Sequence, residues 1–166
     1  VVRIGRCRGE DIPAVLLVTY GNRAVDDTFL ELADTIRANG FVPVCGLAVV
    51  AHHSLMTDVA VGRPDETDVA LIERTARETI EALASARDAH ELELTDIPGA
   101  CPYRAFDGVP FHAKADARSC TGCGACAAQC PTGAIDPVHP AETDTDLCIS
   151  CARCITICPS GARTFS

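Results

Sequence analysis

The stretch CTGCGACAAQCPTGA, residues 120–134, is followed by CISCARCITICPSGA, residues 148–162. Each run holds four cysteines in the spacing C-x2-C-x2-C-x3-C, and a proline follows the last of them. Every cysteine of the first run lies 28 positions before its counterpart in the second, and the Gly-Ala pairs after the prolines keep that offset. This agreement indicates an internal duplication, which predicts two similar halves packed against each other.

The cysteine spacing separates three possible uses of the thiols. Disulfides within one run would close small strained rings, and they would need an oxidising compartment, whereas the start VVRIGRCRGE has no apolar signal-peptide region. Zinc sites with four cysteines usually combine two separated C-x2-C pairs. Three cysteines at consecutive x2 spacings, with a fourth before proline, match the bacterial [4Fe–4S] run. The pattern therefore favours iron–sulfur clusters.

In this type of run the fourth cysteine binds the other cluster, so two runs can exchange their last ligands. We expect two [4Fe–4S] clusters. The first has the ligands Cys120, Cys123, Cys126 and Cys158, and the second has the ligands Cys148, Cys151, Cys154 and Cys130.

The residues between the cysteines differ between the runs. Gly122 and Gly124 allow a tight loop whose N–H groups point at cluster sulfurs. Their counterparts, Ser150 and Ala152, are bulkier. The two sites therefore need not have the same reduction potential.

The formal net charge of −9 argues against nucleic acid or an anionic membrane as partner. No apolar run is long enough to span a bilayer, for which about 20 residues are needed. Together with the reduced thiols this leads us to expect a cytoplasmic protein that docks on redox partners with a basic surface.

The first half alternates strand and helix signals. AVLLVTY, residues 14–20, is a continuous apolar run, which predicts a strand buried on both faces, and a second buried strand is predicted over 41–51. Between them, Asp26 or Asp27 can cap a helix that stops at Asn39-Gly40.

A longer helix is predicted over residues 65–89, after a loop that begins with His52 and His53, which we interpret as solvated. Its apolar stripe consists of Val69, Ile72, Ala76, Ile80 and Leu83. The order strand, helix, strand, helix favours parallel βαβ units.

Prolines and glycines interrupt all periodicity after residue 95. We therefore expect three parts: the α/β portion over 1–95, a linker or ordered arm over 96–117, and the cysteine-rich domain over 118–166.

Residues 118–164 resemble the bacterial two-cluster ferredoxins, including the segments CPTGAI and CPSGAR. The resemblance implies an α+β ferredoxin domain with a pseudo-twofold duplication and one-electron transfer at low potential. Arg163 stands where the first run has Ile135, a departure that we expect to affect packing and not ligation.

The first half, with YGNRAVDDTFLELADTIRANGFVPV, the GRPDETD loop and PYR, resembles the flavodoxin–ferredoxin fusion family, sometimes called ferrodoxins. The resemblance implies a partial flavodoxin-like parallel layer, its C-terminal half only, and FMN at the carboxyl ends of the strands. The residues implied for FMN are Tyr20, Gly21, Asn22 and Arg23. The phosphate-cradling loop has no counterpart here, so we expect FMN only in a longer chain, of which this is the carboxyl-terminal portion.

The sequence therefore predicts an electron carrier with two clusters, coupled to FMN in the full-length protein. Two alternatives stay open: the electron-input domain of a larger flavin-dependent oxidoreductase, and an iron–sulfur sensor or structural module. No acid–base constellation in residues 1–115 supports a substrate site, which argues against an enzyme with its own substrate.

Overall fold

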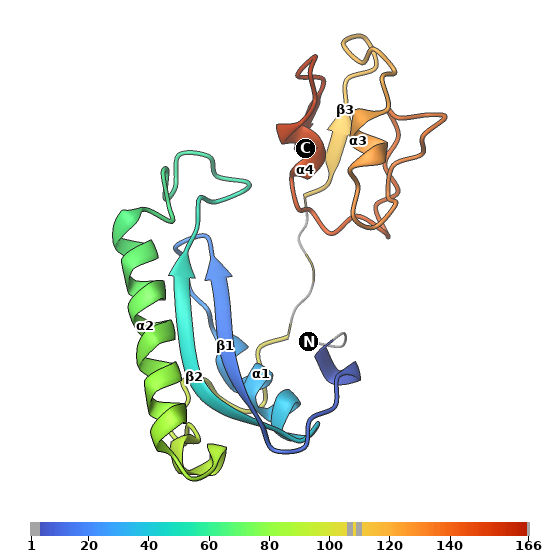
Figure 1. Cartoon of the computed structure of the whole chain (residues 1–166). Coiled ribbons are helices and arrows are strands. Elements are labelled where there is room, and N and C mark those ends of the chain that lie inside the picture. The colour runs from blue at the N-terminus through green and yellow to red at the C-terminus, as the bar shows by residue number, and fades with distance from the viewer. Residues whose placement is uncertain (1–3, 106–107, 109–110, 166) are drawn as a thin grey trace. The chain divides into compact units, whose positions relative to one another are not determined.

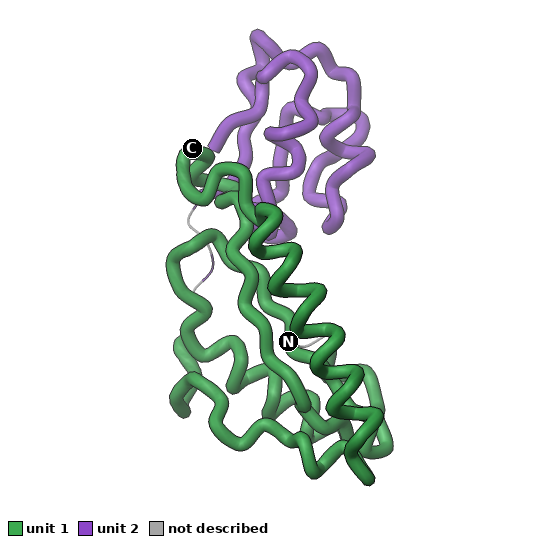
Figure 2. Tube along the Cα trace, turned by 60° about the vertical axis from the view of Figure 1, so that its left-hand side comes forward, with its two compact units in different colours: residues 1–105 green, residues 106–166 purple. Residues whose placement is uncertain are grey.

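The computed structural model describes residues 4–105, 108 and 111–165 of the chain. It divides into two compact units, residues 1–105 and 106–166, which Figure 2 draws in different colours. The boundary falls inside the segment 96–117, of which residues 106, 107, 109 and 110 lie outside the described part.

The first unit is built on two parallel strands, β1 (Ile12–Tyr20) and β2 (Phe41–Val50), joined by helix α1 (Thr28–Arg37) (Figure 1). A longer helix, α2 (Glu66–Ser85), lies against β2. The 3-10 helix η1 (Ile4–Arg6) precedes β1, and η2 (Ala89–Leu92) follows α2. The parallel βαβ arrangement expected from the sequence is confirmed. Among the described residues, no helix combines the length and apolar character needed to cross a membrane.

Helix α1 covers one face of the sheet. Its buried side chains Phe29, Ala33 and Ile36 form a core with Leu16 of β1. The helix ends where expected, because Gly40 has a φ of +83°, and a Cβ there would lie 2.2 Å from the carbonyl oxygen of Gly9. Glycine is thus required at this turn by both conformation and space.

The expectation that β1 is buried on both faces is wrong. Val15 and Leu17 are 54% and 55% exposed, whereas Leu16 between them is 4% exposed. Successive residues of a strand point to opposite faces, and α1 covers only the face that carries Leu16. Helix α2 lies against β2.

The apolar stripe predicted for α2 is not buried along its whole length. Val69 and Ile80 are 46% and 66% exposed.

Helix α2 begins one residue later than predicted because Asp65 is its N-cap. The Asp65 carboxylate accepts hydrogen bonds from the N–H groups of Thr67 and Asp68. The Asp68 carboxylate in turn accepts a hydrogen bond from the Asp65 N–H (2.8 Å), which completes a capping box.

The segment that follows α2 and η2 is tied to α1. Asp27 is the N-cap residue of α1, but its carboxylate makes no capping bond. Instead it accepts hydrogen bonds from the N–H groups of Ala100 (2.8 Å) and Arg104 (2.7 Å). The hydroxyl of Tyr103 donates to Asp34 (2.5 Å), which raises the pKa of Tyr103.

The described residues of the second unit form two short strands and two one-turn helices. Strands β3 (Ala113–Ala115) and β4 (Arg163–Phe165) pair antiparallel. Helices α3 (Ala125–Ala128) and α4 (Arg153–Thr156) each lie within one cysteine run, at the same offset of 28 as the cysteines.

Candidate iron–sulfur centre

Each cysteine run turns sharply before its helix begins. Gly124 precedes α3 with a φ of 72°, and Ala152 precedes α4 with a φ of 61°. Two residues earlier, Gly122 and Ser150 also adopt positive φ, at 69° and 54°. These left-handed residues stand on either side of the second cysteine of each run, Cys123 and Cys151, so the loop curls at that cysteine.

Backbone hydrogen bonds tie the end of each run to the segment that precedes the other run. The carbonyl of Ala134 accepts from the N–H of Asp144 (2.8 Å), and the carbonyl of Ala162 accepts from the N–H of Asp116 (2.9 Å). Because these bonds cross between the runs, the last cysteine of each run is held beside the loop of the other.

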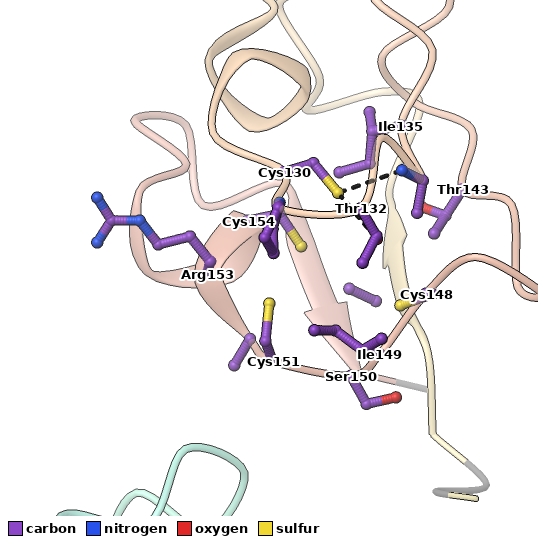
Figure 3. Close-up of a pocket in the computed structure, with 14 residues that line it drawn as sticks. Cys130, Thr132, Ile135, Thr143, Cys148, Ile149, Ser150, Cys151, Arg153 and Cys154 are labelled. Carbon is purple, nitrogen blue, oxygen red and sulfur yellow. Dashed lines mark hydrogen bonds between the residues drawn. The ribbon is translucent and has the colours of Figure 1, made fainter. Parts of the chain in front are cut away.

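The first of two pockets, here pocket A, brings together three cysteines of the second run and the last cysteine of the first (Figure 3). The thiols around it belong to Cys148, Cys151, Cys154 and Cys130. Ile135, which is 3% exposed, also lines this pocket and makes its wall apolar.

Pocket B has the reciprocal composition. Its four cysteines are Cys120, Cys123, Cys126 and Cys158. Pro140, Ala162 and Arg163 complete part of its wall. The structure thus brings together both sets of four cysteines that the sequence analysis groups, each with three members from one run and the last from the other.

The fit to a cluster depends on the thiols and on the available space. Among the described residues, no three His, Cys, Asp or Glu side chains converge closely enough to hold a single metal ion. A four-iron cluster instead takes one thiolate at each iron corner, and four thiols surround each pocket. With the side chains in these orientations each pocket has about 20 Å³ of free space, about enough for one water.

Comparison with protein families gives an independent result. A family model described as a 4Fe–4S dicluster domain matches residues 119–162. Neither the curated proteins nor the solved structures gave a match. Residues 119–162 form a ferredoxin-like iron–sulfur domain. Its cysteines supply the ligands of at least one iron–sulfur cluster, and a role in iron–sulfur electron transfer follows.

Hydrogen bonds favour the thiolate form at the last cysteine of each run in the ferredoxin-like domain. Hydrogen bonding to the Ser160 hydroxyl, with backbone N–H groups, lowers the pKa of Cys158 to about 7. At Cys130, burial alone would raise the pKa, but bonds from Thr132 and from the N–H of Ala134 (3.3 Å) bring it below its ordinary value. Thiolate is the form that binds metal.

Cys154 differs from these two thiols. Burial raises its pKa, and the charge of Arg163 opposes that rise without cancelling it. Thiolate formation at this position therefore depends more on the positive charges nearby, including those of bound iron.

The residues implied for FMN lie at the carboxyl end of β1. Tyr20 and Gly21 line an open cavity of about 200 Å³ together with His52 and His53. Asn22 and Arg23 do not line it, and the Arg23 guanidinium is paired with Asp26 at 3.0 Å. Half of the expected set is thus at the cavity, and the loop that we interpreted as solvated supplies two histidines to it. These residues do not by themselves enclose a flavin.

Sequence analysis misses part of the wall of the two cysteine pockets. Pro140 and Thr143 lie between the runs, outside any repeated motif, and line pockets B and A. Arg163 was expected to matter only for packing, but it lines pocket B as a buried cation, 3% exposed. The sequence signal that could have indicated this role is a charged residue at a repeat position where the first half has isoleucine.

Proposed function

We propose that the chain transfers single electrons through two [4Fe–4S] clusters, one in each cysteine pocket, with the last ligands exchanged between the runs. The observation that carries the proposal is the composition of the pockets, each with three cysteines from one run and the last from the other. The clusters supply the redox chemistry, and the protein supplies ligands, N–H groups and an apolar wall.

A duplicated, pseudo-twofold ferredoxin domain accounts for the matched backbone geometry. The left-handed residues before α3 and α4 match, and so do the cross-bonds at Ala134 and Ala162. Two related halves would each contribute one loop and one last cysteine, so neither site is complete without the other half.

In each transfer, a reduced donor loses one electron to the domain, and an oxidised acceptor later takes that electron, so the chain returns to its starting state. The net charge of −9 stabilises the oxidised state relative to the reduced one, which favours low potentials. Clusters carry one electron at a time, which suits a carrier better than a substrate-specific enzyme.

A redox partner with a basic surface fits the exterior of the domain beside pocket A. Asp144 and Asp146 are exposed near the start of the second run, and so are the apolar side chains of Leu147 (49%) and Ile149 (61%). An apolar centre with an acidic rim is suited to a transient partner that carries lysines and arginines.

Coupling to FMN in a longer chain is part of the proposal. The cavity at Tyr20 and Gly21 supports it, because ligands of parallel α/β sheets bind at the carboxyl ends of the strands. The test is flavin retention by the longer chain, which Tyr20→Ala should lower. Unchanged retention would contradict a role for this cavity.

The central experiment is anaerobic reconstitution followed by iron, sulfide and flavin counting, with EPR of the dithionite-reduced protein. Two clusters require about eight irons and eight sulfides per chain, and two nearby reduced clusters should give a coupled signal. Four irons, or zinc in place of iron, would refute the two-cluster proposal. Reversible titration would support a carrier, whereas clusters that decompose on each oxidation would favour a sensor.

A further inference from the structure

Arg163 carries a positive charge into the interior of the second unit. It occupies the repeat position of Ile135, and both residues are 3% exposed. An isoleucine at such a position only fills space. Burying an arginine without an opposite charge is strongly unfavourable, so the exchange requires a compensating partner.

The groups around the guanidinium are neutral. Nη1 donates to the Thr143 hydroxyl (2.8 Å), and Nη2 donates to the carbonyls of Pro140 and Glu142. The buried Nε has no hydrogen-bond partner in the part of the chain that the structure describes. No carboxylate among those residues forms a salt bridge with Arg163. The charge is hydrogen-bonded but not neutralised.

The guanidinium lies between the two cysteine sets. Its acceptor Pro140 lines pocket B, and its acceptor Thr143 lines pocket A. Arg163 itself lines pocket B. One buried cation is therefore within electrostatic reach of both pockets.

We propose that Arg163 is the buried counter-ion shared by the two clusters, and that its charge raises the reduction potential of both. The inference rests on the two-cluster function proposed above. A cluster with four thiolates is negatively charged, and it gains one further negative charge for each electron that the donor loses. A nearby cation in a poorly solvated interior stabilises the reduced state more than the oxidised state. Arg163 thus limits how low the potentials of this acidic chain become.

Three variants separate charge from packing. Arg163→Gln removes the charge but keeps a polar, uncharged side chain, and Arg163→Lys keeps the charge. Arg118→Gln is the matched control, because it removes an exposed cation of the same unit that lines neither pocket. Each protein is reconstituted anaerobically, its iron and sulfide are counted, and both midpoint potentials are determined by EPR-monitored titration.

Arg163→Gln should lower the reduction equilibrium constant of both clusters, at least tenfold for one of them, which corresponds to about 59 mV for one electron. Arg163→Lys and Arg118→Gln should stay within about twofold of the wild type, since buried charge is kept in the first and solvent screens the lost charge in the second. If Arg163→Gln binds less iron while Arg163→Lys loads fully, the charge is needed to hold the clusters, which also supports the inference.

Two results would overturn the inference about Arg163 while leaving the two-cluster function intact. One is a fully loaded Arg163→Gln protein with wild-type potentials. The other is an Arg163→Lys protein that changes as much as Arg163→Gln, in potential or in iron content, because shape and not charge would then be responsible. A wild-type protein that fails to bind two clusters would refute the proposed function itself, before any variant is compared.

Discussion

Gly122 and Gly124 in the first cysteine run adopt the same left-handed backbone as Ser150 and Ala152 in the second, with φ between 54° and 72°. Glycine adopts this conformation freely, whereas other residues lose roughly 1–2 kcal/mol there. The second run therefore contains backbone strain that the first avoids, although both present their cysteines in the same way. The comparison shows that both runs keep the same loop shape, even where the residues between the cysteines are not glycine.

The second run also makes contacts that the first does not. The buried Ser150 hydroxyl donates to the carbonyl of Phe111, which ties the segment before β3 to the loop. Arg163 introduces a buried charge where the first run has Ile135. The second run is thus less regular because it has additional structural and electrostatic roles.

Removing the last cysteine of one run is the strongest test of the ligand exchange between the runs. Cys130→Ala should remove the second-run cluster, and Cys158→Ala the first-run cluster, so that each variant binds about four irons instead of eight. Iron and sulfide counting with EPR gives the measurement. Cys101→Ala, an exposed cysteine outside both runs, is the control and should keep about eight irons.

Double variants show which cluster each cysteine serves. Adding Cys151→Ala to Cys130→Ala should cost no further iron, because both thiols belong to pocket A. Adding Cys123→Ala should remove the remaining cluster, which belongs to pocket B. The opposite pattern, with iron retained in the Cys130/Cys123 pair and lost in the Cys130/Cys151 pair, would show that the ligands are not exchanged.

Sequence alone was most informative where chemistry constrains local spacing. Eight cysteines at fixed intervals predict the grouping around the two pockets, since only a few loop shapes can bring three close thiols together. The positions of β1 and β2 were also predictable, because a short continuous apolar run bounded by turn residues is typical of a strand.

Burial was less predictable, for physical reasons. An apolar run has the same appearance whether one face or both are covered, so Val15 and Leu17 gave no sign of their exposure. Asp27 stands at a helix start, which predicts a cap, but sequence cannot show that its carboxylate bonds instead to backbone some 70 residues later. Likewise, the sequence shows that residue 163 is a charged arginine but not that its side chain is buried.

The difference in backbone strain between the runs predicts opposite effects for reciprocal substitutions. A Cβ at Gly124 would meet no atom within 4 Å, so Gly124→Ala should destabilise the domain only through its left-handed backbone, by at most about 1–2 kcal/mol, because alanine also lowers the entropy of the unfolded chain. Ala152→Gly should stabilise it by a smaller amount, since glycine also gains entropy in the unfolded chain. Denaturant titrations that follow cluster absorbance test both variants, and a loss of stability in Ala152→Gly would contradict the strain in the second run.

The smallest expected difference concerns the last cysteines and the hydroxyls beside them. Ser160 is the largest cause of the low pKa of Cys158, about 7, so Ser160→Ala should raise that pKa toward its ordinary value of 9.0. Thr132→Val should raise the pKa of Cys130 less, because at Cys130 the backbone N–H of Thr132 lowers the pKa more than the Thr132 hydroxyl does. In the metal-free protein, site-resolved alkylation near pH 7 should therefore slow severalfold at Cys158 and less at Cys130, since the thiolate is the reactive form. Equal slowing at both sites would mean that the hydroxyls act alike, and that the runs differ only in their loops and at Arg163.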